Sequence, residues 1–152
     1  YAQLIEEIDK TEGSKPIAVI FNLGVNDLGN AGNYVSYMTN IASTLKSKNC
    51  KLFYMSVNPI NSTMITKAGR GARTEAQVRE FNSKIRSGLS LDYKYIDMYS
   101  VLMKKGYGTN ASYNGTDADS DDGLHYTTKT FKRIYYYCIT YLNTGSINAS
   151  YY

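Results

Sequence analysis

The chain alternates between two kinds of hydrophobic pattern. Short and nearly unbroken runs of apolar, β-branched or aromatic residues are typical of strands that are buried on both faces. Such runs occupy residues 17–21, 51–57 and 93–98. Elsewhere apolar residues return every three or four positions, which is the period of an amphipathic helix. This spacing predicts helices over residues 2–10, 33–48, 74–89, 99–104 and 127–142.

The ends of these elements carry signals of their own. Thr74 and Gln77 have the spacing of a capping box, so we expect a helix to begin there. Residues 58–73 and 105–121 are rich in polar residues and glycine, and we expect them to be long connections. One stripe of the last predicted helix is expected to face the core, and it consists of Phe131, Ile134, Cys138 and Leu142.

The order of the predicted elements points to an α/β fold. Strands that alternate with helices form a parallel sheet, with helices packed on both of its faces. The chain has room for one domain, so we interpret residues 1–152 as a single domain. Three strands are few for a sheet of this kind. We therefore expect the chain to be the back portion of a larger α/β domain.

Composition narrows the functional classes. Hydrophobic residues make up 43% and charged residues 20%, which excludes a wholly disordered chain and a collagen. The net charge of +4 comes from scattered lysines and arginines, which argues against a nucleic-acid partner. No apolar run is long enough to span a membrane. The 16 tyrosines, the absence of tryptophan and the many Asn, Ser and Thr residues favour an extracellular or cell-surface protein.

Neither the cysteines nor the acidic residues match a metal site. Cys50 and Cys138 are far apart in the sequence and are placed near the amino end of the sheet, as a disulfide or as two buried free thiols. Three aspartates alternate as at the start of a calcium loop, namely Asp117, Asp119 and Asp121. However, the required glycine falls one position late, and Thr128 stands where a glutamate is needed.

The candidate chemistry lies in two segments near the carboxyl ends of the strands, where open parallel sheets bind their ligands. The only histidine, His125, is either structural or a general base, and Asp122 either orients its ring or caps the following helix. Asn26 follows the first strand and either forms a turn or donates to an oxyanion. Gly24 would let a substrate approach the backbone closely.

Together these two segments resemble blocks of the SGNH (GDSL-like) hydrolase family. Gly24-Val25-Asn26-Asp27 is similar to its G-x-N-D block, and Asp122-Gly123-Leu124-His125 to its D-x-x-H block. The resemblance implies a three-layer α/β/α sandwich with a flavodoxin-like parallel sheet. It also implies that Asn26 supplies an oxyanion donor, Asp122 the acid and His125 the base. We expect Asn26 and His125 to face one cleft, with Asp122 hydrogen-bonded to His125.

The chain departs from that family to a large extent, because two of its blocks are missing. The G-D-S block with the nucleophilic serine and the block with the oxyanion glycine are absent from the sequence. The three predicted strands would correspond to the third, fourth and fifth strands of the family. We therefore expect the sheet to be completed by a missing N-terminal segment or a second chain, which would supply the serine.

The resulting expectation is a serine esterase that removes acetyl or other small acyl groups, with an acylated carbohydrate as the expected substrate. Three residues are considered as substrate-side walls, with ordinary loop packing as the alternative: Asn58, Tyr107 and Tyr113. The resemblance implies no metal and no organic cofactor. The alternative function is a non-catalytic carbohydrate-binding or interaction module on a similar scaffold, which the missing serine favours.

Overall fold

The computed structural model of the chain describes residues 1–11, 13–108 and 122–148. Its three strands form one parallel sheet in the order β1-β2-β3, with β1 at Ile17–Phe21, β2 at Cys50–Met55 and β3 at Tyr93–Ile96. The helices of the described residues are α1 (Ala2–Lys10), α2 (Ala31–Ser47), α3 (Ser62–Lys67), α4 (Glu75–Gly88), α5 (Met98–Lys104) and α6 (Thr128–Thr144). The predicted α/β fold with parallel strands is confirmed.

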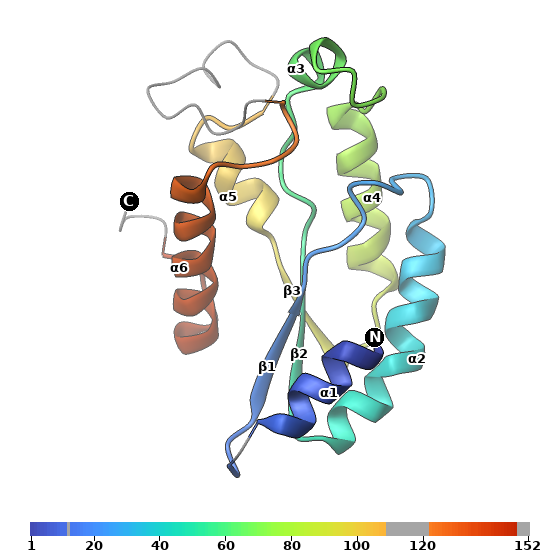
Figure 1. Ribbon diagram of the computed structural model, residues 1–152, viewed down its shortest axis with the longest axis vertical. Helices are drawn as coiled ribbons and strands as arrows, with labels where there is room; N and C mark the ends of the chain where they lie inside the picture. Colours follow the sequence, from blue (N-terminus) through green and yellow to red (C-terminus); the bar gives the residue numbers. More distant parts are fainter. Residues whose placement is uncertain (12, 109–121, 149–152) are drawn as a thin grey trace.

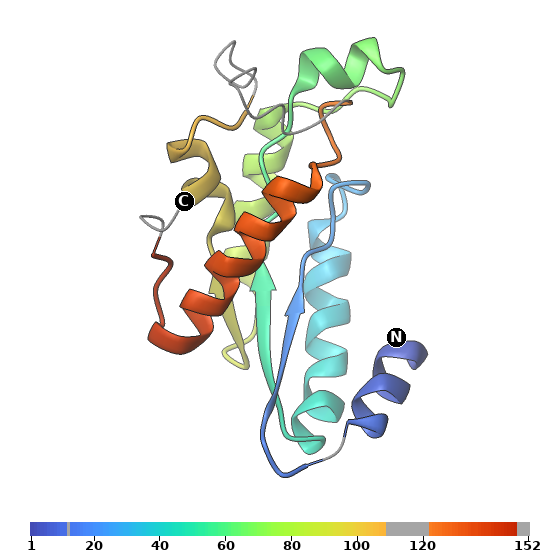
Figure 2. The same cartoon turned by 60° about the vertical axis from the view of Figure 1, so that its left-hand side comes forward.

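The helices lie on both faces of the sheet, which gives three layers (Figures 1 and 2). Alternate side chains of β2 enter two separate cores, because successive residues of a strand point to opposite faces. Leu52 and Tyr54 pack with α1, α2 and α4, whereas Phe53 and Met55 pack with α5 and α6. Burial of both faces of β2 explains why its sequence is a nearly continuous apolar run.

Side-chain caps mark the starts of α3 and α4. Thr74 and Gln77 form the predicted capping box at the start of α4. The helix α3 lies within residues 58–73, which were expected to be an irregular connection, so that prediction is wrong there. Its six residues are too few to show a hydrophobic period, and it begins where Oδ1 of Asn61 accepts a hydrogen bond from the N–H of Met64 at 3.1 Å.

The two cysteines are free and buried, and the structure explains why they do not pair. Cys50 opens β2 and packs on the α2 side of the sheet. Sγ of Cys138 lies 3.6 Å from Sδ of Met55, at the other end of β2 and on the other face. The expectation that both cysteines lie at the amino end is therefore wrong for Cys138.

Two further observations bear on the surroundings of the sheet. Among the described residues, no strand pairs with the edge of β1 that faces away from β2. In the same part of the chain, none of the helices combines the length and hydropathy that crossing a membrane requires.

Candidate functional site

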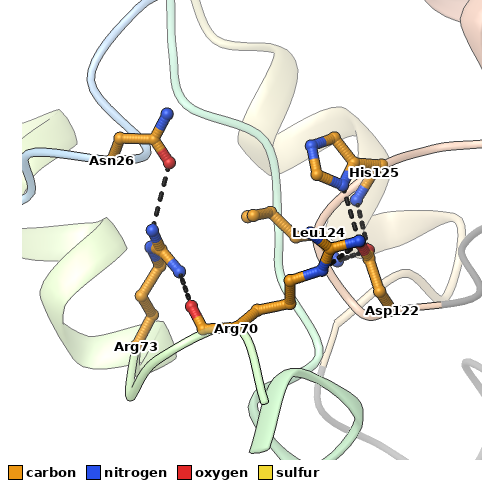
Figure 3. Close-up of polar contacts among 6 residues, drawn as sticks. All are labelled: Asn26, Arg70, Arg73, Asp122, Leu124 and His125. Carbon is orange, nitrogen blue, oxygen red and sulfur yellow. Dashed lines mark hydrogen bonds and ion pairs between the residues drawn. The ribbon is translucent and has the colours of Figure 1, made fainter. Parts of the chain in front are cut away.

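The segment before α6 folds around the carboxylate of Asp122. Oδ1 of Asp122 accepts hydrogen bonds from the backbone N–H groups of Leu124 at 2.9 Å and His125 at 2.8 Å. Oδ2 lies 2.7 Å from Nδ1 of the His125 ring, so the expected hydrogen bond between the two side chains is present (Figure 3). Asp122 does not cap α6, because Thr127 occupies the N-cap position. One carboxylate therefore both closes the turn and holds the imidazole.

The environment of Asp122 keeps its carboxyl group ionised. Burial on its own would raise the pKa of Asp122, but the backbone N–H and the ring of His125, followed by the N–H of Leu124, hold that pKa well below its usual range. Nε of Arg70 lies 3.3 Å from Oδ2 and adds a positive charge. Because an ionised carboxylate can only accept hydrogen bonds, Nδ1 of His125 must donate. Nε2 then carries the lone pair, and it has no hydrogen-bond partner among the described residues.

Contacts with the start of α3 and with the connection that follows β2 position this segment. The N–H of Asn61 donates to the carbonyl of Gly123 at 2.9 Å, and the hydroxyl of Tyr126 donates to the carbonyl of Pro59 at 2.5 Å. Gly123 has a φ of +79°, and a Cβ there would lie 2.4 Å from the carbonyl oxygen of Asn61. Only glycine fits this position, so the docking of the turn depends on it.

A pocket of about 170 Å³ lies beside His125, next to the residues that follow β1 and β2. Two amides contribute polar groups to its wall. Nδ2 of Asn22 donates to the carbonyl of Ser56 at 2.8 Å, while Oδ1 of Asn58 is buried and accepts no hydrogen bond within the described chain. The remaining wall is mostly apolar and consists of Leu23, Val25, Val57, Pro59, Ile60, Leu124, Tyr126 and Phe131.

Asn26 lies in an adjacent pocket. The expectation of one shared cleft is not met: His125 lines the first pocket and Asn26 the second, and Val25 contributes to both. Nη2 of Arg73 donates to Oδ1 of Asn26 at 3.0 Å, and Figure 3 shows the Nδ2 of Asn26 on the side away from Arg73. Nη1 of Arg73 reaches the carbonyl of Arg70, whose side chain pairs with Asp122. The Arg70–Arg73 segment thus connects the two predicted blocks.

The structure gives other predicted residues a packing role. Gly24 has a φ of +113°, and a Cβ there would lie 2.1 Å from the ring of Phe81, so packing requires a glycine at this position. Tyr107 is buried and packs edge-on against Tyr126 instead of lining the pocket. Tyr113 and the three alternating aspartates lie outside the described residues.

Three residues of the site were missed by the sequence analysis. Arg70 and Arg73 belong to a polar connection without a recognisable motif, and only the fold brings them to Asn26 and Asp122. Phe131 shares the helical period of the core residues of α6, yet its side chain is 54% exposed and lines the pocket. Spacing alone could not separate Phe131 from its buried neighbours, so its predicted inward orientation is wrong.

No protein-family model, curated protein or solved structure matches this chain. The arrangement offers a general base with a fixed tautomer, a carboxylate that orients it and an amide held in one orientation. Within the described residues, no serine is hydrogen-bonded to His125, and none lines its pocket. No three described His, Cys, Asp or Glu side chains are grouped as metal ligands would be.

Proposed function

We propose that this chain carries the base, its orienting acid and one oxyanion donor of a serine esterase of the SGNH (GDSL-like) type. The hydrogen bond of 2.7 Å between Asp122 and the Nδ1 of His125 is the observation that carries the proposal. It leaves Nε2 as a proton acceptor beside a pocket near the carboxyl ends of β1 and β2, where parallel sheets bind ligands.

The proposed reaction uses a serine from outside residues 1–152. Its Oγ attacks the carbonyl carbon of the ester while its proton passes to Nε2 of His125, and Asp122 stabilises the imidazolium that forms. Nδ2 of Asn26 donates to the oxyanion, with its amide held in place by Arg73. The tetrahedral intermediate then collapses, and the leaving alcohol takes the proton from His125. A water molecule next attacks the acyl-enzyme by the same route and releases the acid.

The open edge of β1 is a site where the segment that bears the serine could pair with the sheet. An unpaired edge presents backbone N–H and C=O groups that another strand can use. We therefore propose that an N-terminal segment or a second chain pairs with β1. Its first turn after the strand would then lie at the same end of the sheet as Asn26.

The size and lining of the pocket support a particular substrate class. About 170 Å³ accommodates a small acyl group such as acetyl, and the exposed ring of Phe131 offers a flat face to a sugar. The proposed substrate is a small acyl ester, in particular an acetylated carbohydrate. This proposed substrate and the polar, tyrosine-rich composition of the chain both favour an extracellular or cell-surface location. The mechanism uses no cofactor.

The test compares the chain alone with a longer protein that adds the residues encoded immediately upstream. We expect no burst and negligible hydrolysis of p-nitrophenyl acetate by the chain alone, and both a burst and turnover by the longer protein. His125→Ala should lower the turnover of the longer protein by about 10³-fold or more. Lys132→Ala on the exposed face of α6 serves as the control and should leave turnover unchanged. Equal turnover by the His125→Ala variant would refute the mechanism.

The rival function is a non-catalytic carbohydrate-binding module. It is favoured by one observation, that no serine of the described residues lines the pocket of His125. The same experiment separates the two. A longer protein without esterase activity that nevertheless binds acetylated sugars through the pocket would support the module.

A further inference from the structure

A second pocket of about 230 Å³ adjoins the pocket of His125 and has a different character. The two pockets share Val25, so a ligand that extends past this residue would occupy both. Arg70 and Arg73 line the second pocket together with Asn26 and Gln77. No described Asp or Glu is part of this lining, so the lining residues carry two positive charges and no negative one.

The charge of Arg70 has a partner, whereas the charge of Arg73 has none among the described residues. Arg70 pairs with Asp122, whereas among the described residues the half-buried Arg73 forms hydrogen bonds only to neutral oxygens. Its Nε donates to the carbonyl of Val25 at 3.0 Å, and its two terminal nitrogens donate to Arg70 and Asn26. A guanidinium group has five N–H donors, so one remains on each terminal nitrogen.

Three hydrogen bonds also fix the guanidinium group of Arg73 in place. A cation that is already held rigidly loses little conformational freedom when a ligand binds to it. Two remaining N–H groups on a planar fork match two oxygens of a carboxylate or a phosphate. Partial burial limits the screening of the interaction by salt. These features favour an anionic ligand over a neutral one.

We infer that the pocket of Arg73 binds the anionic group of the substrate, a carboxylate or a phosphate close to the ester that His125 acts on. This inference rests on the proposed esterase function and specifies its substrate class. The substrate is then an acylated anionic compound, such as an ester of an acidic or phosphorylated sugar. Arg73 serves as a binding residue. Its hydrogen bond to Asn26 also fixes the position of the oxyanion donor relative to the bound anion.

The test measures binding without any reaction, by NMR on the ¹⁵N-labelled 152-residue chain. Glucuronate, glucose 6-phosphate and neutral glucose are titrated, and the Nε–Hε signal of Arg73 is followed. We expect both anions to shift this signal and to bind about tenfold or more tightly than glucose. The tighter of the two anions identifies carboxylate or phosphate as the natural group. Binding should weaken as sodium chloride is added.

Two variants change the charge of the pocket in different ways: one removes a positive charge and the other adds a negative charge. Arg73→Gln should weaken the binding of both anions about tenfold or more, with Arg86→Gln, on the far end of α4, as its control. Gln77→Glu keeps the capping box, since a glutamate also serves there, but puts a negative charge into the pocket wall. It should weaken binding while Ala76→Glu, with the same charge on the neighbouring residue outside the pocket, should not. The second pair keeps Arg73 intact and so remains informative if Arg73→Gln fails to fold.

Two results would overturn the inference. Either both anions bind no more tightly than glucose, or Gln77→Glu binds them as tightly as Ala76→Glu. The outcome is independent of the esterase test. Hydrolysis of p-nitrophenyl acetate that depends on His125, together with no anion binding, would refute only the anionic substrate. Anion binding without any hydrolysis by the longer protein would refute the esterase, and the pocket of Arg73 would remain an anion site without a role in ester hydrolysis.

Discussion

Arg73 donates a hydrogen bond from Nη2 to Oδ1 of Asn26 at 3.0 Å, although the two residues are 47 positions apart. This bond fixes which end of the amide accepts and which end donates. Nδ2 is left on the side away from Arg73, where it can serve as an oxyanion donor (Figure 3). If Asn26 has this role, we expect Arg73 to act on the reaction of a neutral ester mainly through Asn26.

A double-mutant cycle in the proposed longer protein, which would add the serine-bearing segment, tests this dependence with p-nitrophenyl acetate as the neutral ester. Asn26→Ala should lower kcat by about 10²–10³-fold, as the loss of one oxyanion donor does. Arg73→Ala should lower kcat less, because the amide loses only its fixed orientation. The double variant should be no slower than Asn26→Ala alone. Multiplied losses would show that Arg73 acts independently of Asn26.

Asp122 should stabilise the fold in a manner that depends on pH. A carboxyl group with a lowered pKa in the folded state contributes its full stability above the unfolded pKa of about 3.9. The contribution is lost as the pH falls through the lower, folded pKa. Asp122→Ala should therefore reduce the free energy of unfolding by about 1–2 kcal/mol at pH 7. The gap to the wild-type chain should shrink progressively below pH 4.

Urea unfolding curves at pH 7, 5, 4 and 3 measure this gap. Asp92→Ala is a suitable control, because it removes an exposed carboxylate that pairs with Lys46. Its effect at pH 7 should be smaller than that of Asp122→Ala. A gap for Asp122→Ala that stays constant from pH 7 to pH 3 would show that the ionised carboxylate contributes nothing.

The tautomer of His125 can be observed directly, because it is the only histidine in the chain. The ¹⁵N spectrum of the neutral ring should show the proton on Nδ1, as the hydrogen bond to Asp122 requires. In Asp122→Ala this preference should disappear, since no carboxylate remains to accept the proton. A wild-type ring with its proton on Nε2 would contradict the assignment of His125 as a general base.

The packing role of Gly24 can be tested by measuring how much a substitution there destabilises the chain. Gly24→Ala forces a Cβ into the ring of Phe81 and an L-residue into a φ of +113°, so it should destabilise the chain by about 2 kcal/mol or more. Gly32→Ala is the matched control, because Gly32 lies in α2 with free space around it. There alanine should stabilise by about 0.5–1 kcal/mol. Thermal unfolding of both variants measures the difference, and a neutral Gly24→Ala would refute the packing role.

Local patterns in the sequence determined most of the architecture. The runs that became β1, β2 and β3 and the helical period of α2, α4 and α6 are read from neighbouring residues, as is the capping box at Thr74. The pairing of Asp122 with His125 is also local, because two residues three positions apart in a turn can meet without help from the rest of the fold.

Tertiary structure alone decided the remaining features of the site. Arg73 meets Asn26, and Arg70 meets Asp122, only because the connection around α3 lies over the carboxyl end of the sheet. No periodicity encodes such contacts, since they depend on how separate elements pack. The same holds for the exposed ring of Phe131, which repeats with the core residues of α6 but lies where no described element covers it fully. The periodicity of a sequence indicates which residues share a helix face, whereas their burial depends on what packs against that face.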